Sequence, residues 1–109
     1  MARYCVVLVS ASSASEGRKI ALTLLKEKLA ACVNIVPKIS SSYWWKGRIE
    51  TASESLLVIK TRGSAVRGLI NKVKKLHSYA VPEVIALPIL DGNRDYLLWI
   101  DQSMEKRRR

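Results

Sequence analysis

His77 is the single histidine of the chain, and Cys5 and Cys32 are its two cysteines, so these side chains are the first candidates for binding a transition metal. A neutral imidazole is a good ligand for copper or zinc, and a thiolate suits Cu(I). No Cys-x-x-Cys or His-x-x-x-His spacing is present to give a local metal signature. We take His77 and Cys32 as candidate ligands. The alternatives are a histidine hydrogen bonded at a helix end and thiols buried as small apolar groups.

Cys32 and His77 also have the chemistry of a nucleophile and its general base. No third residue that would orient the histidine is evident, and the chain has no glycine-rich phosphate-binding loop. Catalysis therefore ranks last among the functions considered, and we expect a protein that is not an enzyme.

The first elements that must position these side chains follow from the apolar pattern. Residues 4–10 form a continuous apolar run, which predicts a central strand covered on both faces. Ser13 and Glu16 have the spacing of a capping box, which predicts a helix that ends near Leu29 or Ala30. Residues 31–36 then predict a second strand that is bent or at an edge, because Pro37 interrupts it.

Residues 39–62 are predicted to form a long β-hairpin that turns at Lys46 and Gly47. A hairpin of this length leaves an exposed strand edge, and such an edge is a template for pairing with another chain. We therefore expect the hairpin to meet other copies of itself.

A second helix is predicted to follow the hairpin, with Gly63 and Ser64 at its start. Its apolar stripe recurs with helical spacing at Val66, Leu69, Ile70, Val73 and Leu76. Residues 83–89 predict a fourth strand, and Tyr96, Trp99 and Ile100 mark one face of a short final helix.

The resulting order, β-α-β-β-α-β with a terminal helix, predicts an α+β, ferredoxin-like fold. We expect one domain over residues 1–103 and a basic tail over residues 104–109. Both helices of this fold cover the same face of the sheet, yet the first strand has no polar face. The second face must therefore be covered, and another copy of the same sheet is the simplest cover.

The chain has 19 Lys and Arg against 9 Asp and Glu, a formal net charge of +10. This excess raises nucleic acid, anionic membranes and acidic ligands as partners, and solubility as the plain alternative. An RNA-recognition module would need aromatic residues in its third strand, and residues 48–62 contain none, so nucleic acid is not expected. No signal peptide or membrane-spanning run is present, so we expect a cytoplasmic protein with reduced thiols and no membrane insertion.

Five blocks of sequence, in the same order, resemble the CutA divalent-cation tolerance family. They are LKEKLAACVN (25–34), SYWWKG (42–47), IKT (59–61), HSYAVPEVIAL (77–87) and GNRDYLLW (92–99). The resemblance implies a ferredoxin-like homotrimer involved in tolerance of divalent metals, with copper or another divalent cation as the bound ion. It also implies an alternative, because the trimer is similar to PII-type proteins: a scaffold for a small anion or a partner protein, with metal binding incidental.

The family pattern is incomplete at the metal positions. Some members of the family place copper ligands at the positions of Val9, Leu76 and His77, and only His77 can ligate here. The family's usual His-Pro-Tyr-Glu connector reads His77-Ser78-Tyr79-Ala80, so a proline and a carboxylate are missing.

The resemblance further implies that Tyr43, Lys60, Tyr79 and Glu83 meet near a subunit boundary. Lysine and tyrosine hydroxyls suit a small anion, and the alternative is a polar network that sets the trimer geometry. Trp44, Trp45 and Trp99 are expected in the interface, since aromatic residues are enriched there, although bases could also stack on the two hairpin tryptophans.

Overall fold

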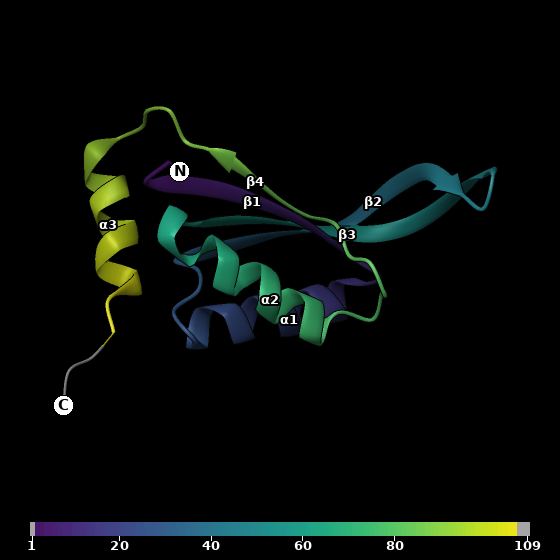
Figure 1. Cartoon of the computed structure of the whole chain (residues 1–109), viewed down its shortest axis with the longest axis horizontal. Coiled ribbons are helices and arrows are strands. Elements are labelled where there is room, and N and C mark those ends of the chain that lie inside the picture. The colour runs from purple at the N-terminus through teal and green to yellow at the C-terminus, as the bar shows by residue number, and fades with distance from the viewer. Residues whose placement is uncertain (1, 107–109) are drawn as a thin grey trace.

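The computed structural model describes residues 2–106 and has the predicted ferredoxin-like order of elements (Figure 1). The elements are β1 (Tyr4–Ala11), α1 (Ala14–Lys26), β2 (Cys32–Trp45), β3 (Arg48–Arg62), the 3-10 turn η1 (Gly63–Ala65), α2 (Val66–Leu76), β4 (Val84–Pro88) and α3 (Arg94–Met104). The strands form one antiparallel sheet in the order β2-β3-β1-β4, so the predicted fold class is confirmed.

Both α1 and α2 pack on one face of the sheet, and α3 lies across one end of it (Figure 1). Side chains along β1 alternate between the two faces of the sheet. Cys5, Val7 and Val9 point toward the helices and are almost completely buried. Leu24 and Leu69 of the two helices close the core over them and are fully buried.

The second face of the sheet carries apolar side chains that remain about half exposed to solvent. In register with Leu8 of β1 are Val58 of β3 and Ile85 of β4. Ile85 and Leu87 on this face are 48% and 47% exposed. The expectation of an uncovered apolar face is therefore met within the described chain, and this surface is called the open face below.

The hairpin of β2 and β3 projects well beyond the body of the protein (Figure 1). Its turn is where the sequence predicts it: Lys46 and Gly47 both have positive φ, 50° and 75°, as a two-residue type I′ turn requires. β2 lies at the edge of the sheet and runs through Pro37 without ending. Instead, a β-bulge between Val36 and Ile39 absorbs the proline.

Two predicted helix boundaries are wrong. α1 ends at Lys26, because Lys28 takes a left-handed φ of 60° and Leu29 donates its N–H back to the Leu24 carbonyl. This pairing is a Schellman motif with lysine where glycine is usual. Ser64 does not cap α2: the N-cap residue is Ala65, and no side chain bonds there.

One of the two hydrogen bonds of the predicted capping box at the start of α1 is confirmed. Ser13 Oγ accepts a hydrogen bond from the Glu16 N–H at 3.1 Å, as predicted. The Glu16 carboxylate does not return to the Ser13 N–H, and accepts instead from Ser12.

Met104, the first residue of the expected basic tail, is the last residue of α3. It is buried against Thr61 Oγ1 at 3.6 Å, so it is part of the domain. The arginines 107–109 of the predicted basic tail lie outside the described residues.

Candidate functional site

His77 lies directly after α2, and its side chain is completely buried. Its Nε2–H donates a 2.7 Å hydrogen bond to the Ser10 carbonyl, which can only accept. This bond places the proton on Nε2, and Nδ1 then accepts from the Tyr79 N–H at 3.1 Å. Both ring nitrogens are therefore engaged in hydrogen bonds within the chain. This matches the alternative to metal binding, a histidine hydrogen bonded at a helix end.

Glu16 of α1 connects this histidine to the start of the helix layer. Its Oε1 accepts from Ser12 and lies 3.9 Å from His77 Nδ1, and its Oε2 accepts from the Ser78 N–H at 2.9 Å. Burial would raise the pKa of this carboxyl, but the hydrogen bonds from Ser12 and Ser78 outweigh burial and lower the pKa to about 2. Glu16 is thus ionised and holds the connector after α2 in place.

Tyr79 extends the same network to the hairpin. Its hydroxyl donates a 2.6 Å hydrogen bond to Glu54 Oε2 of β3, and its ring lies 4.6 Å from the His77 ring, centroid to centroid. Burial, followed by the neighbouring Glu54 carboxylate, raises the pKa of Tyr79 above its ordinary value. Tyr79 therefore stays a hydrogen-bond donor over the physiological range.

A groove of about 920 Å³ runs from this network along the projecting part of the hairpin. It is lined by Ser41, Ser42, Tyr43, Trp45, Glu50, Glu54, Tyr79, Ala80, Val81 and Glu83. Tyr43, Tyr79 and Glu83 of the predicted cluster thus come together, and Ser10 Oγ donates to Glu83 Oε1 at 3.5 Å. Its lining residues include three glutamates and no lysine or arginine, so the groove suits a cation better than an anion.

Lys60, which the family resemblance grouped with Tyr43, Tyr79 and Glu83, does not line the groove of this chain. It pairs in register with Val6 and Cys32 on the open face, and its Nζ donates to Asn34 Oδ1. Glu83 and Glu54 lie near the opposite end of β1, at Ser10 and Ala11. Glu50 and Glu54 line the groove, and neither residue was predicted from the sequence.

The two candidate metal ligands do not converge. Cys32 is in register with Val6 across the intervening strand β3, since both pair with Lys60. His77 lies beside Ser10, roughly 13 Å further along β1 at 3.3 Å per residue. Over residues 2–106 no group of three or more His, Cys, Asp and Glu side chains is placed to hold a metal ion. The donors of one chain therefore do not fit a metal site, because His77 has no free nitrogen and Cys32 has no second strong ligand beside it.

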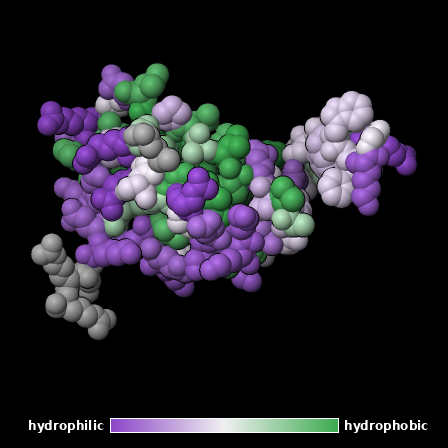
Figure 2. Space-filling model, in the orientation of Figure 1, coloured by the Kyte–Doolittle hydropathy of each residue, from purple (hydrophilic) through white to green (hydrophobic). Residues whose placement is uncertain are grey.

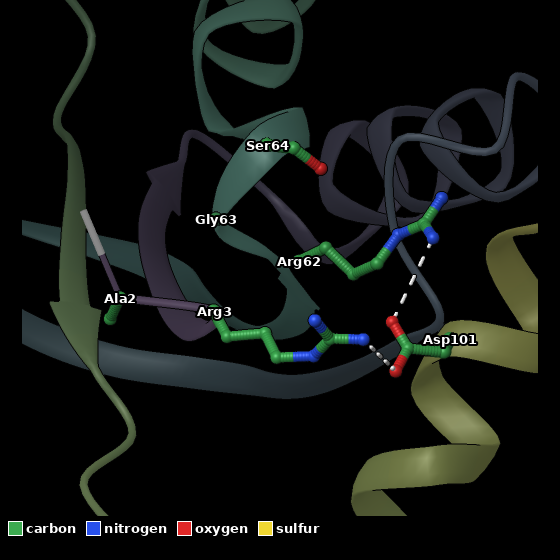
Figure 3. Close-up of a pocket in the computed structure, with 6 residues that line it drawn as sticks. All are labelled: Ala2, Arg3, Arg62, Gly63, Ser64 and Asp101. Atoms are coloured by element: carbon green, nitrogen blue, oxygen red, sulfur yellow. Dashed lines mark hydrogen bonds and ion pairs between the residues drawn. The ribbon is translucent and has the colours of Figure 1, made fainter.

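A smaller pocket of about 400 Å³ lies between the start of β1, the end of β3 and α3 (Figure 3). Arg3 and Arg62 both point at Asp101, with N–O distances of 3.2 and 3.7 Å. The Tyr4 hydroxyl donates to the same carboxylate at 2.6 Å and is the first cause of its lowered pKa. Because Asp101 already neutralises one of the two arginines, we interpret this cluster as a clamp that fixes α3 to the sheet.

The three tryptophans lie on two separate surfaces. Trp44 and Trp45 flank the hairpin turn and are 73% and 58% exposed, whereas Trp99 lies on α3 against Tyr96, with ring centroids 5.5 Å apart. Exposed aromatic rings of this size are typical of interface cores.

The family model described as CutA1 divalent ion tolerance protein matches residues 5–103. This chain belongs to the CutA1 family. The resemblance inferred from five short blocks is therefore confirmed. The family is named for tolerance of divalent ions and not for a reaction.

CutA1 relatives of known sequence come from distant organisms. The divalent-cation tolerance protein CutA of Thermus thermophilus is 48% identical over 98 residues, covering 90% of this chain and 95% of the relative. The chloroplastic protein CutA 1 of Oryza sativa is 52% identical over 98 residues, covering 90% of this chain and 55% of the relative. The chain thus spans about half the length of the plant relatives.

Solved CutA1 structures have the same fold. The CutA1 crystal structure from Oryza sativa matches with a TM-score of 0.93 and 48% identity, covering 97% of both chains. The periplasmic divalent cation tolerance protein CutA from Archaeoglobus fulgidus matches with a TM-score of 0.91 and 41% identity, covering 94% of this chain and 99% of that chain. In this CutA1 chain, no helix among the described residues is long and apolar enough to cross a membrane.

Proposed function

We propose that this CutA1 protein acts in divalent-cation tolerance as a homotrimer whose subunits pack through their open faces. The observation that carries the proposal is the open face itself, on which Leu8, Val58 and Ile85 form an apolar strip across three strands. Such a strip exposed to water is unfavourable by about 25 cal/mol per Å² of apolar area, so a second copy that covers it gains that energy.

The hairpin supports the same assembly. Its outer half extends past the body, and Trp44 and Ile49, opposite one another in register, are 73% and 66% exposed. A neighbouring subunit that covers this arm would bury both side chains and its unpaired strand edge.

Copper binding, in this proposal, uses donors from more than one subunit. Cys32 is partly exposed on the open face, so its thiol would be brought into the interface when the faces pack. His77 keeps its structural hydrogen bonds and is not a ligand. A thiolate suits Cu(I), and neighbouring subunits would supply the remaining donors.

Assembly is tested by sedimentation velocity at micromolar concentration on two matched variants. Ile85→Asp places a charge on the open face and Leu22→Asp places one on the helix layer, at side chains that are 48% and 51% exposed. We expect a trimer for the wild-type chain and for Leu22→Asp, and a smaller species for Ile85→Asp. A folded wild-type monomer, or a trimer unaffected by Ile85→Asp, would contradict assembly through the open face.

Copper binding is tested by titrating the reduced protein with Cu(I) in the presence of a competing chelator. Cys32→Ser is expected to abolish binding, while Cys5→Ala, at a thiol that is 3% exposed, is expected to leave it unchanged. If Cys32→Ser binds copper as the wild type does, Cys32 is not a ligand.

A scaffold function is the second candidate, and the groove is the observation that favours it. With Glu50, Glu54 and Glu83 on its walls and without Lys60, the groove suits a basic segment of a partner protein rather than a small anion. Capture of a lysine-rich peptide, lost in Glu50→Gln with Glu83→Gln, would support this function; equal binding by wild type and variant would exclude it.

A further inference from the structure

The outer face of the helix layer is strongly basic. α1 and α2 lie side by side over the sheet (Figure 1), and hydrophilic side chains cover the surface at their position (Figure 2). Residues 14–29 and 66–76 contain eight Lys and Arg side chains and two glutamates. More than two fifths of the 19 basic residues are thus concentrated on this layer, here called the basic layer.

The two glutamates do little to neutralise the basic layer. Glu16 is turned inward to Ser12 and Ser78, and Glu27 pairs with Lys72 at 3.0 Å. Among residues 2–106, Lys72 is the one basic side chain of this layer that forms an ion pair. Six others are exposed with their charges free for a partner: Arg18, Lys19, Lys26, Arg67, Lys74 and Lys75.

An apolar side chain lies in the middle of these charges. On the α1 helix, positions three and four residues apart share a face, so Leu22 lies between Arg18, Lys19 and Lys26. Its side chain is 51% exposed and points away from the core. Long basic side chains around an exposed leucine suit an anionic lipid surface, because their stems cover apolar area while their charges reach headgroups.

The composition of the layer distinguishes a lipid surface from a nucleic acid. Neither α1 nor α2 contains an aromatic residue on which a base could stack. An exposed leucine gains free energy when it enters lipid, whereas a phosphate backbone offers it no apolar partner.

We propose that the basic layer of α1 and α2 is a peripheral docking surface for a membrane rich in anionic lipids. Six exposed cations meet the headgroups, and Leu22 enters the boundary between headgroups and acyl chains. The surface lies on the opposite side of the sheet from the open face, so the open face is free for subunit packing while the layer is bound. In a trimer packed through its open faces each basic layer faces outward, so the docking surface belongs to a single chain and needs no second layer on the same membrane.

The test is flotation of the full chain with two kinds of vesicle: phosphatidylcholine alone, and phosphatidylcholine with about one third phosphatidylserine. Lys19→Glu with Lys74→Glu removes one exposed cation from each helix. Lys38→Glu with Arg94→Glu makes the same change of net charge on exposed residues outside the layer. Circular dichroism confirms that each variant is folded, and a duplex DNA of random sequence provides the competing polyanion.

Binding is expected only to the anionic vesicles and is expected to fall as salt rises toward about 0.15 M. At about fivefold per charge, the variant in the layer should bind at least about 25-fold more weakly than wild type, while the control variant keeps most of its binding. Leu22→Ser should weaken vesicle binding and leave any binding of DNA unchanged. Equal losses in the two charge variants, or tighter binding of DNA with no effect of Leu22→Ser on vesicles, would overturn the proposal.

Discussion

The Tyr79 hydroxyl donates a 2.6 Å hydrogen bond to Glu54 Oε2, and this contact joins the connector after α2 to the base of the hairpin. Glu54 is a carboxylate that is only 8% exposed, and Tyr79 is the donor that satisfies it. The two residues are 25 positions apart in the sequence, so the contact fixes the hairpin arm relative to the helix layer.

Replacing Tyr79 with Phe should therefore destabilise the fold. The buried Glu54 carboxylate loses its donor, which costs about 1.5–3 kcal/mol for a hydrogen bond to a charged group. Tyr43→Phe is the matched control on the other wall of the groove, and no hydrogen bond of the Tyr43 hydroxyl is present among the described residues. Urea unfolding at one fixed protein concentration measures both variants, and an equal loss in the two would contradict this role of Tyr79.

Glu16→Gln should destabilise the protein at neutral pH and much less at low pH. The folded pKa of Glu16, about 2, lies below the ordinary value of 4.5 for this carboxyl. Its ionised form therefore contributes stability that is fully present above 4.5 and is lost as pH falls through about 2. We expect a loss of about 2 kcal/mol at pH 7. The difference between variant and wild type should shrink as unfolding is measured at decreasing pH, and a constant difference would refute the linkage.

Lys28→Gly should stabilise the end of α1. Lys28 has a φ of 60°, a conformation that costs an L-residue about 1–2 kcal/mol and glycine almost nothing. Part of this gain is offset by the lost bond from Lys28 Nζ to the Ser103 carbonyl, so we expect a net gain of about 0.5–1 kcal/mol. Lys26→Gly, inside the helix, should instead lose about 1 kcal/mol. Thermal unfolding distinguishes these opposite signs.

Gly17→Ala should be destabilising despite the higher helix propensity of alanine. A Cβ on Gly17 would lie 2.9 Å from Ser55 Oγ, which is held by its own hydrogen bond to the Ser13 carbonyl, and 3.1 Å from Leu57. Overpacking of this kind costs about 1–3 kcal/mol. Gly68→Ala on α2 is the control, because its Cβ meets only the flexible end of half-buried Leu29. Denaturant midpoints of the two variants give the comparison.

The order of elements was predictable because apolar periodicity is a local property. The Lys46–Gly47 turn and the stripe from Val66 to Leu76 needed no knowledge of long-range contacts. The end of α1 was missed because Glu27, Lys28 and Leu29 are all good helix formers, and only packing of the next strand makes Lys28 turn.

Part of the groove followed from the family resemblance, which placed Tyr43, Tyr79 and Glu83 together. Tyr43, Tyr79 and Glu83 flank turns and strand ends, where side chains from different elements meet. Glu54 lies in a polar stretch of the hairpin whose sequence is typical of a solvent-exposed surface. It is buried because Tyr79, from a distant part of the chain, packs on it and donates to it. Within one chain Lys60 lies beside Cys32 and not at the groove, because its position depends on pairing over the whole hairpin.

The bulge in β2 decides which side chains the hairpin offers to the groove. Val36 lies opposite Leu56 and Ile39 opposite Glu54, so β2 advances three positions while β3 advances two. The extra residue reverses the odd–even parity of the outer arm, and it brings Tyr43 and Trp45 to the face that carries Glu54. If β2 kept its full length and continued the inner register without the bulge, Ser42 and Trp44 would lie opposite Glu50 and Arg48 in place of Tyr43 and Trp45. A single position in the edge strand therefore sets the chemical character of the groove.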